Sequence, residues 1–326
     1  MDYSSCGLYG VQSKKRLALY LGITDKRYFK QTFVNGHVHP YLEEKCGKKR
    51  LIEPPDDELK RIQKRIKNFL SQIQVPEYVF SGVKTKSYVD NAKLHAGKLY
   101  VYKLDLTAFF PSTPRERAYS FFRDRLKTSP DVAECLTNFV TVDLDMADCG
   151  DIESINSFLR EKNICERKHL ISGSPASQLL SYLLNVEMFD LLAAIAQNQA
   201  MTMSIYVDDI VFSSEHKISK SVQNRLLKVI RLFGFLESKK KIKSYSNCYP
   251  KLVTGVTISK NGVCVVRNSM SNRIMAELCY LKEHPEDRTS KLRLQGLVSA
   301  AQQVDSNAFP SVRYYAYGKP KKKRRK

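Results

Sequence analysis

The sequence predicts an α+β fold whose centre is a split βαβ sheet of the ferredoxin-like kind. A strand-like run at 99–105 is followed by a region of helical periodicity that starts at 115–127. Two further apolar β-type runs then flank an acidic turn, Asp208-Asp209, and an amphipathic helix follows at 218–233. This order, with a hairpin between two helical regions, is that of the split βαβ motif.

The N-terminal region is predicted to be helical at 13–33 and to carry short strands within 37–54. Pro54-Pro55 then interrupts the chain, and Asp56 is a suitable N-cap for the helix that follows. One face of this helix is apolar, formed by Leu59, Ile62, Ile66 and Leu70.

The middle of the chain contains an aspartate-rich segment at 143–166, which we expect to be an irregular, solvated surface insertion. A loose cation-binding loop is the alternative, although the segment lacks the glycine turn and terminal glutamate of an EF-hand. Residues 167–175 connect this insertion to the next element, and Gly173-Ser174-Pro175 precedes one long helix predicted at 177–197.

The C-terminal part is predicted to begin with a hairpin of strands 252–258 and 262–267, joined through Asn261-Gly262. Two helices, at 269–283 and 290–304, then complete the predicted fold.

The composition predicts a polyanionic partner. The net charge is +21, and removing the seven basic residues of the tail at 319–326 still leaves +14. Such a surplus favours nucleic acid, because each neutralised phosphate releases counterions. A solvated basic face is the alternative. The tail itself resembles a nuclear-import signal, a disordered RNA-binding tail or an added element.

The chain lacks features of a membrane or secreted protein. No apolar run reaches the roughly 18 residues that a bilayer span needs, and the first residues do not form a secretory signal. Its eight cysteines are scattered without a CxxC pair, so we expect reduced thiols and no structural zinc site. The predicted location is the cytoplasm.

Three aspartates form a candidate catalytic centre. Asp208 and Asp209 lie at a strand turn, where like charges repel unless a cation compensates them. Asp105 ends another strand, so all three carboxylates can converge at one sheet edge. There they could hold two Mg²⁺ ions about 3.5–4 Å apart, as in-line phosphoryl transfer requires. Aspartates are also common at ordinary turns, which is the alternative.

Several motifs carry a family resemblance. Four segments resemble, in the expected order, the palm motifs of reverse transcriptases: Leu104-Asp105 with Phe109 to Ser112, Ser172 to Ser177, Tyr206 to Asp209, and Gly234-Phe235 with Ser238 to Lys240. Asn91 to His95 fits the Asn-Ala-x-x-His segment of bacterial retron enzymes, and Val253-Thr254-Gly255 fits their Val-Thr-Gly segment. Over residues 48–305 the chain therefore resembles a retron-type reverse transcriptase.

This resemblance implies a right-hand polymerase with fingers, palm and helical thumb. Residues 1–98 would form N-terminal helices and fingers, and 268–318 the thumb, followed by the basic tail. Residues 99–267 would form the palm with the split βαβ sheet, the acidic insertion at 143–166 and a return to the fingers near 167–175. Asp105, Asp208 and Asp209 would be the catalytic metal ligands, with two Mg²⁺ ions as cofactors and Mn²⁺ as a substitute.

The resemblance also implies nucleotide-binding residues. Arg50 would contact the triphosphate, Phe110 would exclude a 2′-hydroxyl, Gly173 would let the backbone approach the nucleotide, and Lys240 would position or protonate pyrophosphate. The alternatives are an RNA-backbone contact for Arg50, a core position for Phe110, a helix-entry turn for Gly173 and a solvated charge for Lys240.

The retron segments imply RNA-binding residues, Asn91, His95, Val253, Thr254 and Gly255. A buried, hydrogen-bonded histidine and a simple strand entry are the alternatives for these two segments. Departures from the family pattern include Ser172 in place of glutamine and Lys241 in place of threonine.

The implied partners are a structured non-coding RNA as template and primer, dNTPs, the DNA product and an effector protein encoded nearby in a bacterium, serving anti-phage defence. A non-retron defence or intron-like reverse transcriptase is an alternative. So is a polymerase fold that only binds RNA. Phe110 disfavours an RNA-making polymerase.

Overall fold

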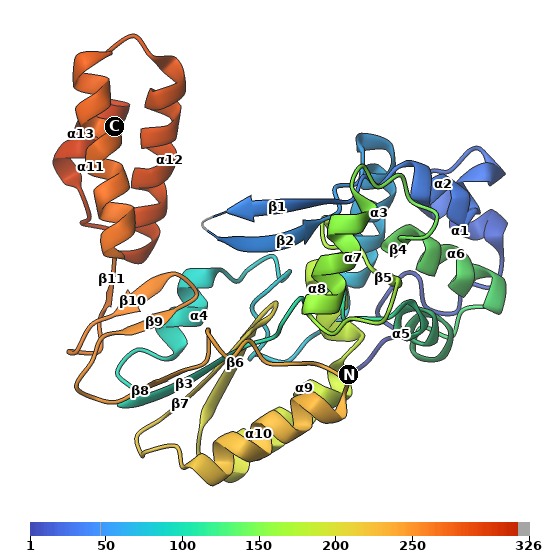
Figure 1. The fold of residues 1–326 in the computed structure, drawn as a ribbon, viewed down its shortest axis with the longest axis horizontal. Helices are drawn as coiled ribbons and strands as arrows, with labels where there is room; N and C mark the ends of the chain where they lie inside the picture. Colours follow the sequence, from blue (N-terminus) through green and yellow to red (C-terminus); the bar gives the residue numbers. More distant parts are fainter. Residues whose placement is uncertain (46, 319–326) are drawn as a thin grey trace, which may run out of the picture.

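The computed structural model describes residues 1–45 and 47–318 and shows an α+β fold. A four-stranded sheet lies at its centre (Figure 1). Its strands pair antiparallel in the order β6-β7-β3-β8. They are β3 (Tyr100–Asp105), β6 (Thr202–Tyr206), β7 (Asp209–Ser214) and β8 (Lys243–Tyr245). The α+β class is confirmed, and α10 (Lys220–Leu232) joins β7 to β8 as one helical connection of this sheet. Strand β8 was not predicted.

Both faces of this sheet are covered because side chains alternate along each strand. On one face Val101 and Val211 pack in a small core with α4 (Tyr88–Leu94). On the other face Tyr102, Leu104 and Phe212 belong to the main core, which includes α10 and α9 (Val186–Asn198).

The N-terminal helix predicted at 13–33 is wrong as one element. Gly22 has a left-handed backbone (φ 61°) and ends the first helix. The segment instead contains α1 (Lys14–Leu21), the 3₁₀ helix η1 (Lys26–Phe29) and α2 (Gln31–Gly36). A hairpin of β1 (Tyr41–Lys45) and β2 (Lys48–Ile52) follows, and then α3 (Asp57–Leu70), whose predicted cap by Asp56 is confirmed.

The segment at 143–166 is not irregular. It contains α7 (Ile152–Glu161), which is capped by Asp151. Asp143, the first residue of the segment 143–166, is buried in a small sheet. That sheet pairs β4 (Thr141–Asp143) with β5 (Lys168–Leu170). Preceding it are α5 (Arg115–Ser120), the π-helix η2 (Phe121–Arg125) and α6 (Pro130–Val140).

The single helix predicted at 177–197 is two helices. Between α8 (Ser177–Leu183) and α9 the axis bends by 69° at Leu184-Asn185. Asn185 leaves the helical region (φ −124°), and its side chain donates to the Ser181 carbonyl and accepts from Arg117. Within the described residues no single helix is long and apolar enough to cross a bilayer, and this bent pair passes only jointly, on length and composition.

The C-terminal part contains three short strands and three helices. The strand predicted at 252–258 is two strands, because Thr254 and Gly255 adopt positive φ and turn the chain. The strands are β9 (Lys251–Val253), β10 (Val256–Ile258) and β11 (Cys264–Val265). The predicted hairpin through Asn261-Gly262 is confirmed between β10 and β11.

A separate helical group with its own core ends the described chain and stands apart in Figure 1. It consists of α11 (Asn268–Glu283), α12 (Arg288–Val304) and α13 (Pro310–Tyr317), of which α13 was not predicted. The basic tail at 319–326 lies outside the described residues. Seven cysteines within the described residues are free.

Candidate active site

The three candidate aspartates meet at one end of the central sheet. Asp105, the last residue of β3, is paired in register with Asp209, the first residue of β7. Asp208 lies in the turn between β6 and β7, and its carbonyl accepts a hydrogen bond from the Leu106 amide at 3.0 Å. The predicted convergence of these residues at one edge is confirmed.

The turn that carries Asp208 is strained. Tyr206 and Asp209 are paired across the hairpin, so Val207 and Asp208 form a two-residue loop. Val207 has a φ of 59°, which a β-branched side chain rarely tolerates. Such strain persists only where the surroundings enforce it, and it is concentrated at functional sites.

Two lysines lie against the carboxylates. The Lys241 ammonium is 2.7 and 2.9 Å from the two oxygens of Asp105. The Lys103 ammonium is 2.9 Å from Asp209 Oδ2. Lys103 precedes Asp105 by two residues on β3 and therefore lies on the same face of the sheet. These ammonium groups supply positive charge to an otherwise acidic edge.

The carboxylates remain electrostatically unfavourable despite these lysines. Burial, and then the charge of Asp208, raise the pKa of Asp105 to about 7, although Lys241 acts in the opposite direction. Burial and then the charge of Asp209 also raise the pKa of Asp208. A cation bound between these groups would relieve the repulsion.

The donor set suits a divalent ion, because hard carboxylate oxygens are its preferred ligands. Nevertheless, among residues 1–45 and 47–318 no three His, Cys, Asp or Glu side chains are grouped closely enough to hold one. Ion binding at this edge would therefore need the three carboxylates to be arranged differently from this structure.

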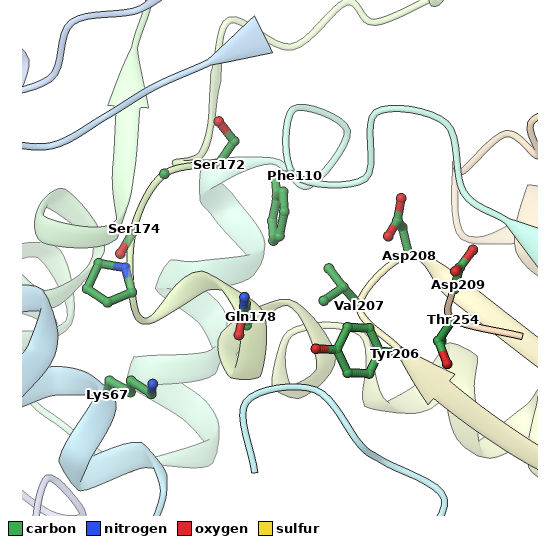
Figure 2. A pocket seen from close by; sticks show the side chains of 12 residues that line it. Lys67, Phe110, Ser172, Ser174, Gln178, Tyr206, Val207, Asp208, Asp209 and Thr254 are labelled. Carbon is green, nitrogen blue, oxygen red and sulfur yellow. The ribbon is translucent and has the colours of Figure 1, made fainter. Parts of the chain in front are cut away.

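A cleft of about 550 Å³ adjoins this acidic edge. Figure 2 shows Phe110 between Asp208 on one side and the loop that carries Ser172 and Ser174 on the other, and all four residues line the cleft. Phe110 is half-buried and also packs against the main core. The sequence left two alternatives for Phe110, a core position or a position in the site. In the structure, Phe110 both packs against the core and lines the cleft.

Of the other predicted nucleotide-binding residues, one lines the cleft and two are exposed outside it. Gly173 lines the cleft, and a β-carbon built there would lie only 2.4 Å from the Glu53 carbonyl oxygen. Arg50 is exposed on β2, where it pairs in register with Glu43, and it does not line the cleft. Lys240 is also exposed, and its neighbour Lys241 is the residue that contacts Asp105.

The two retron-type segments lie side by side. Thr254 Oγ1 donates to the Tyr88 carbonyl at 2.8 Å and accepts from Asn91 Nδ2 at 3.4 Å. Thr254 also lines the cleft. Asn91 and Val253 are buried, whereas Gly255 is exposed at the turn. Asn91 and Val253 thus support this corner from within and cannot touch RNA directly in this conformation.

His95 is buried and hydrogen-bonded, which is the alternative to the predicted RNA contact. Its ring nitrogens lie 2.7 Å from Ser213 Oγ and 2.7 Å from Ser204 Oγ. Burial, and then the charge of Lys98, lower the pKa of His95 to about 3. The neutral ring therefore ties α4 to both strands of the catalytic hairpin, and it does not reach the surface.

The family model described as "Reverse transcriptase (RNA-dependent DNA polymerase)" matches residues 37–263, which contain this entire acidic edge. The chain belongs to the reverse transcriptase family. The resemblance to retron enzymes is confirmed by the comparisons, and the matched family is described as one of RNA-dependent DNA polymerases.

Three retron reverse transcriptases illustrate the relationship. The Retron Se72 reverse transcriptase of Salmonella heidelberg is 28% identical over 78% of this chain, a match that spans 63% of the relative's length. The Escherichia coli Retron Ec83 enzyme is 23% identical over 78% of this chain and 79% of its own. The Retron Ec86 enzyme, also from Escherichia coli, is 25% identical over 70% and 65%. The chain thus spans less than two thirds of two of these relatives.

Sequence reasoning missed four polar residues of this reverse transcriptase. Lys103 and Lys241 hold the carboxylates, and Glu53 and His169 form a buried pair behind the cleft. The alternation of Lys103 with Asp105 along β3 was a usable signal. No local pattern identifies the other three, because their partners lie far away in the sequence.

Proposed function

We propose that this reverse transcriptase extends a primer with dNTPs on an RNA template, using Asp105, Asp208 and Asp209 as its catalytic carboxylates. The observation that carries the proposal is the register pairing of Asp105 with Asp209 beside Asp208 and the cleft. Within a family of RNA-dependent DNA polymerases, this edge is the place where carboxylates with raised pKa values require a cation.

The cofactor would be a pair of Mg²⁺ ions, with Mn²⁺ as a substitute. Ions bound there supply activation of the primer hydroxyl and neutralisation of charge at phosphorus. The protein's part is to present deprotonated carboxylates on a rigid hairpin. Lys241 holds Asp105 in place and opposes the rise in its pKa, and Lys103 holds Asp209.

The cleft would receive the incoming nucleotide. Phe110 on its wall would lie beneath the sugar and exclude a 2′-hydroxyl, and the close backbone approach at Gly173 would shape the opposite wall. Arg50, on the exposed β1–β2 hairpin, would reach the triphosphate if the hairpin closes over the cleft, and Lys240 would face the departing pyrophosphate.

The architecture would follow from this assignment. Residues 1–98 would supply the fingers, 99–267 the palm and 268–318 the thumb. In support, the palm range contains the central sheet, and the thumb range contains the separately packed helices α11, α12 and α13.

The template and primer would be a structured non-coding RNA, and the product a DNA strand made on it. The support is the similarity to retron enzymes and the net charge of +14 that remains without the tail. Thr254 would meet this RNA at the cleft, where Asn91 holds its side chain, and Gly255 would meet it at the adjoining exposed turn. We place the system in the bacterial cytoplasm, in anti-phage defence with an effector encoded nearby.

The test is an RNA-templated primer extension with the Asp208→Asn variant. We expect dNTP incorporation to be lost, while RNA affinity stays within about threefold because this carboxylate binds cations and no phosphate. The matched control is Asp148→Asn, an exposed aspartate away from the cleft. Unchanged incorporation by a folded Asp208→Asn protein would refute the proposal. RNA binding without incorporation by the wild type would instead indicate an RNA-binding module.

A further inference from the structure

A buried ionisable pair lies behind the cleft and takes no part in the acidic site. Glu53 Oε1 is 2.7 Å from His169 Nε2, and both side chains are fully buried. Glu53 follows the last residue of β2, whereas His169 is the middle residue of β5. The pair therefore joins two elements that are separated by 116 positions in the chain.

The second oxygen of Glu53 holds the cleft loop. Glu53 Oε2 accepts the backbone N–H of Ser172 at 2.8 Å, and the Ser172 hydroxyl donates to the Leu51 carbonyl at 3.2 Å. At Gly173 the loop passes so close to the Glu53 carbonyl that a β-carbon would overlap it. Three successive contacts thus fasten the loop to the base of the β1–β2 hairpin.

This loop forms one wall of the cleft. Ser172, Gly173 and Ser174 all line it. In Figure 2, Ser172 and Ser174 lie on one side of Phe110 and Asp208 lies on the other. The same hairpin base continues into β2, where Arg50 lies three residues before Glu53. The pair is therefore placed where a small displacement would alter both the cleft wall and the hairpin.

The cost of burying these groups favours a specific role. A buried carboxylate and imidazole lose hydration, and an apolar pair of the same size is often at least as stable. His169 Nδ1 has no hydrogen-bond partner within the described residues. If Nε2 carries the hydrogen and donates to Glu53, the unpaired Nδ1 is only an acceptor and no N–H is orphaned.

We propose that Glu53 and His169 are positioning residues that hold the Ser172–Gly173 wall and thereby set the affinity for the incoming nucleotide. The inference rests on the proposed function, because it assigns the cleft to a dNTP. Neither side chain touches the cleft; they act through the backbone of Ser172 and Gly173.

The test compares steady-state dNTP kinetics of four variants. Glu53→Ala and His169→Ala should each raise KM for dNTP about tenfold with kcat within about twofold, the pattern of lost ground-state binding. The double variant should be no worse than either single one, because the residues act as a unit. His169→Gln should restore KM, since its amide nitrogen can donate from the position of Nε2.

A buried residue with no hydrogen bond to Glu53, His169 or Ser172 provides the matched control. Asn138 accepts from Arg115 at 2.7 Å and donates to the Phe29 carbonyl at 3.2 Å, and it does not line the cleft. Asn138→Ala should lower Tm and leave KM for dNTP unchanged. If His169→Gln and His169→Ala have the same KM as Asn138→Ala, the pair is only structural and the proposal is overturned.

Hydrogen exchange separates this proposal from the proposed function. The Ser172 amide should exchange faster in Glu53→Ala than in Asn138→Ala, whether or not the protein is active, because its acceptor has been removed. If the wild type incorporates no dNTP, the proposed function has failed, and the affinity claim fails with it. If the wild type is active but Ser172 exchange is unchanged in Glu53→Ala, this inference alone is wrong.

Discussion

The Lys241 ammonium forms hydrogen bonds to both carboxylate oxygens of Asp105, at 2.7 and 2.9 Å. The protein thus provides its own cation at the position where the proposed reaction needs a divalent one. In the sequence comparison by motif, Lys241 stands where the resembled pattern has threonine, a residue that carries no such charge.

Replacing Lys241 should strengthen Mg²⁺ binding. In Lys241→Met the competing ammonium is absent. The Mg²⁺ concentration that gives half of the maximal increase in Tm should therefore fall by about threefold or more. Without Mg²⁺ the variant should be less stable than the wild type, because Asp105 is left buried and unpaired. Thermal unfolding over a Mg²⁺ titration measures both effects. Lys243→Met, an exposed neighbour on β8, is the control, and equal midpoints in both variants would contradict the competition.

Removing the Phe110 ring should relax sugar discrimination. Phe110→Ala opens space beside the proposed sugar position, so the ratio of kcat/KM for dGTP to that for GTP should fall by at least about tenfold. Phe110→Tyr keeps the ring and should keep the ratio. If Phe110→Ala leaves the ratio at the wild-type value in a folded protein, the residue serves only the core.

Acidification should destabilise the protein through His95. Its pKa is about 3 in the folded protein against an ordinary value of 6.5, so the unfolded chain binds a proton first as pH falls. The contribution of neutral His95 to the free energy of unfolding is present above pH 6.5 and is lost progressively as the pH falls towards 3. Between pH 7 and pH 5 this group should remove about 2 kcal/mol from the free energy of unfolding.

The His95→Asn variant isolates this contribution. It should be less stable than the wild type at pH 7, because the contacts to Ser204 and Ser213 are weakened. The stability difference should narrow by about 2 kcal/mol at pH 5, since the variant cannot gain that proton. Urea unfolding at each pH measures it. A difference that is constant with pH would show that His95 is readily protonated in the fold.

A single methyl group at Gly173 should disrupt the cleft. In Gly173→Ala the new β-carbon meets the Glu53 carbonyl oxygen at 2.4 Å, a backbone atom that cannot rotate away. We expect a lower Tm and a higher KM for dNTP, because the loop must move. Gly296→Ala is the control: it has open space within α12 and should gain up to about 1 kcal/mol from helix propensity. Wild-type Tm and KM in Gly173→Ala would show that the loop adapts freely.

Local signals in the sequence determined much of the fold. The alternation along β3, the paired strands around Asp208 and the cap at Asp56 each depend on neighbours within a few residues. The predicted order of β3, the β6–β7 hairpin and α10 therefore matches the structure, and the three aspartates could be assigned to one edge. The helix breaks at Gly22 and Asn185 were missed, because apolar periodicity continues across both positions.

Only the tertiary structure decided which polar groups meet. Lys241 lies 136 positions from Asp105, and Glu53 lies 116 positions from His169, so no sequence period connects either pair. Their contact depends on how β8, β5 and the cleft loop pack, which hydrophobic burial over the whole core controls. The same packing turned His95 inward, because two serines on neighbouring strands satisfy both ring nitrogens and make its burial favourable.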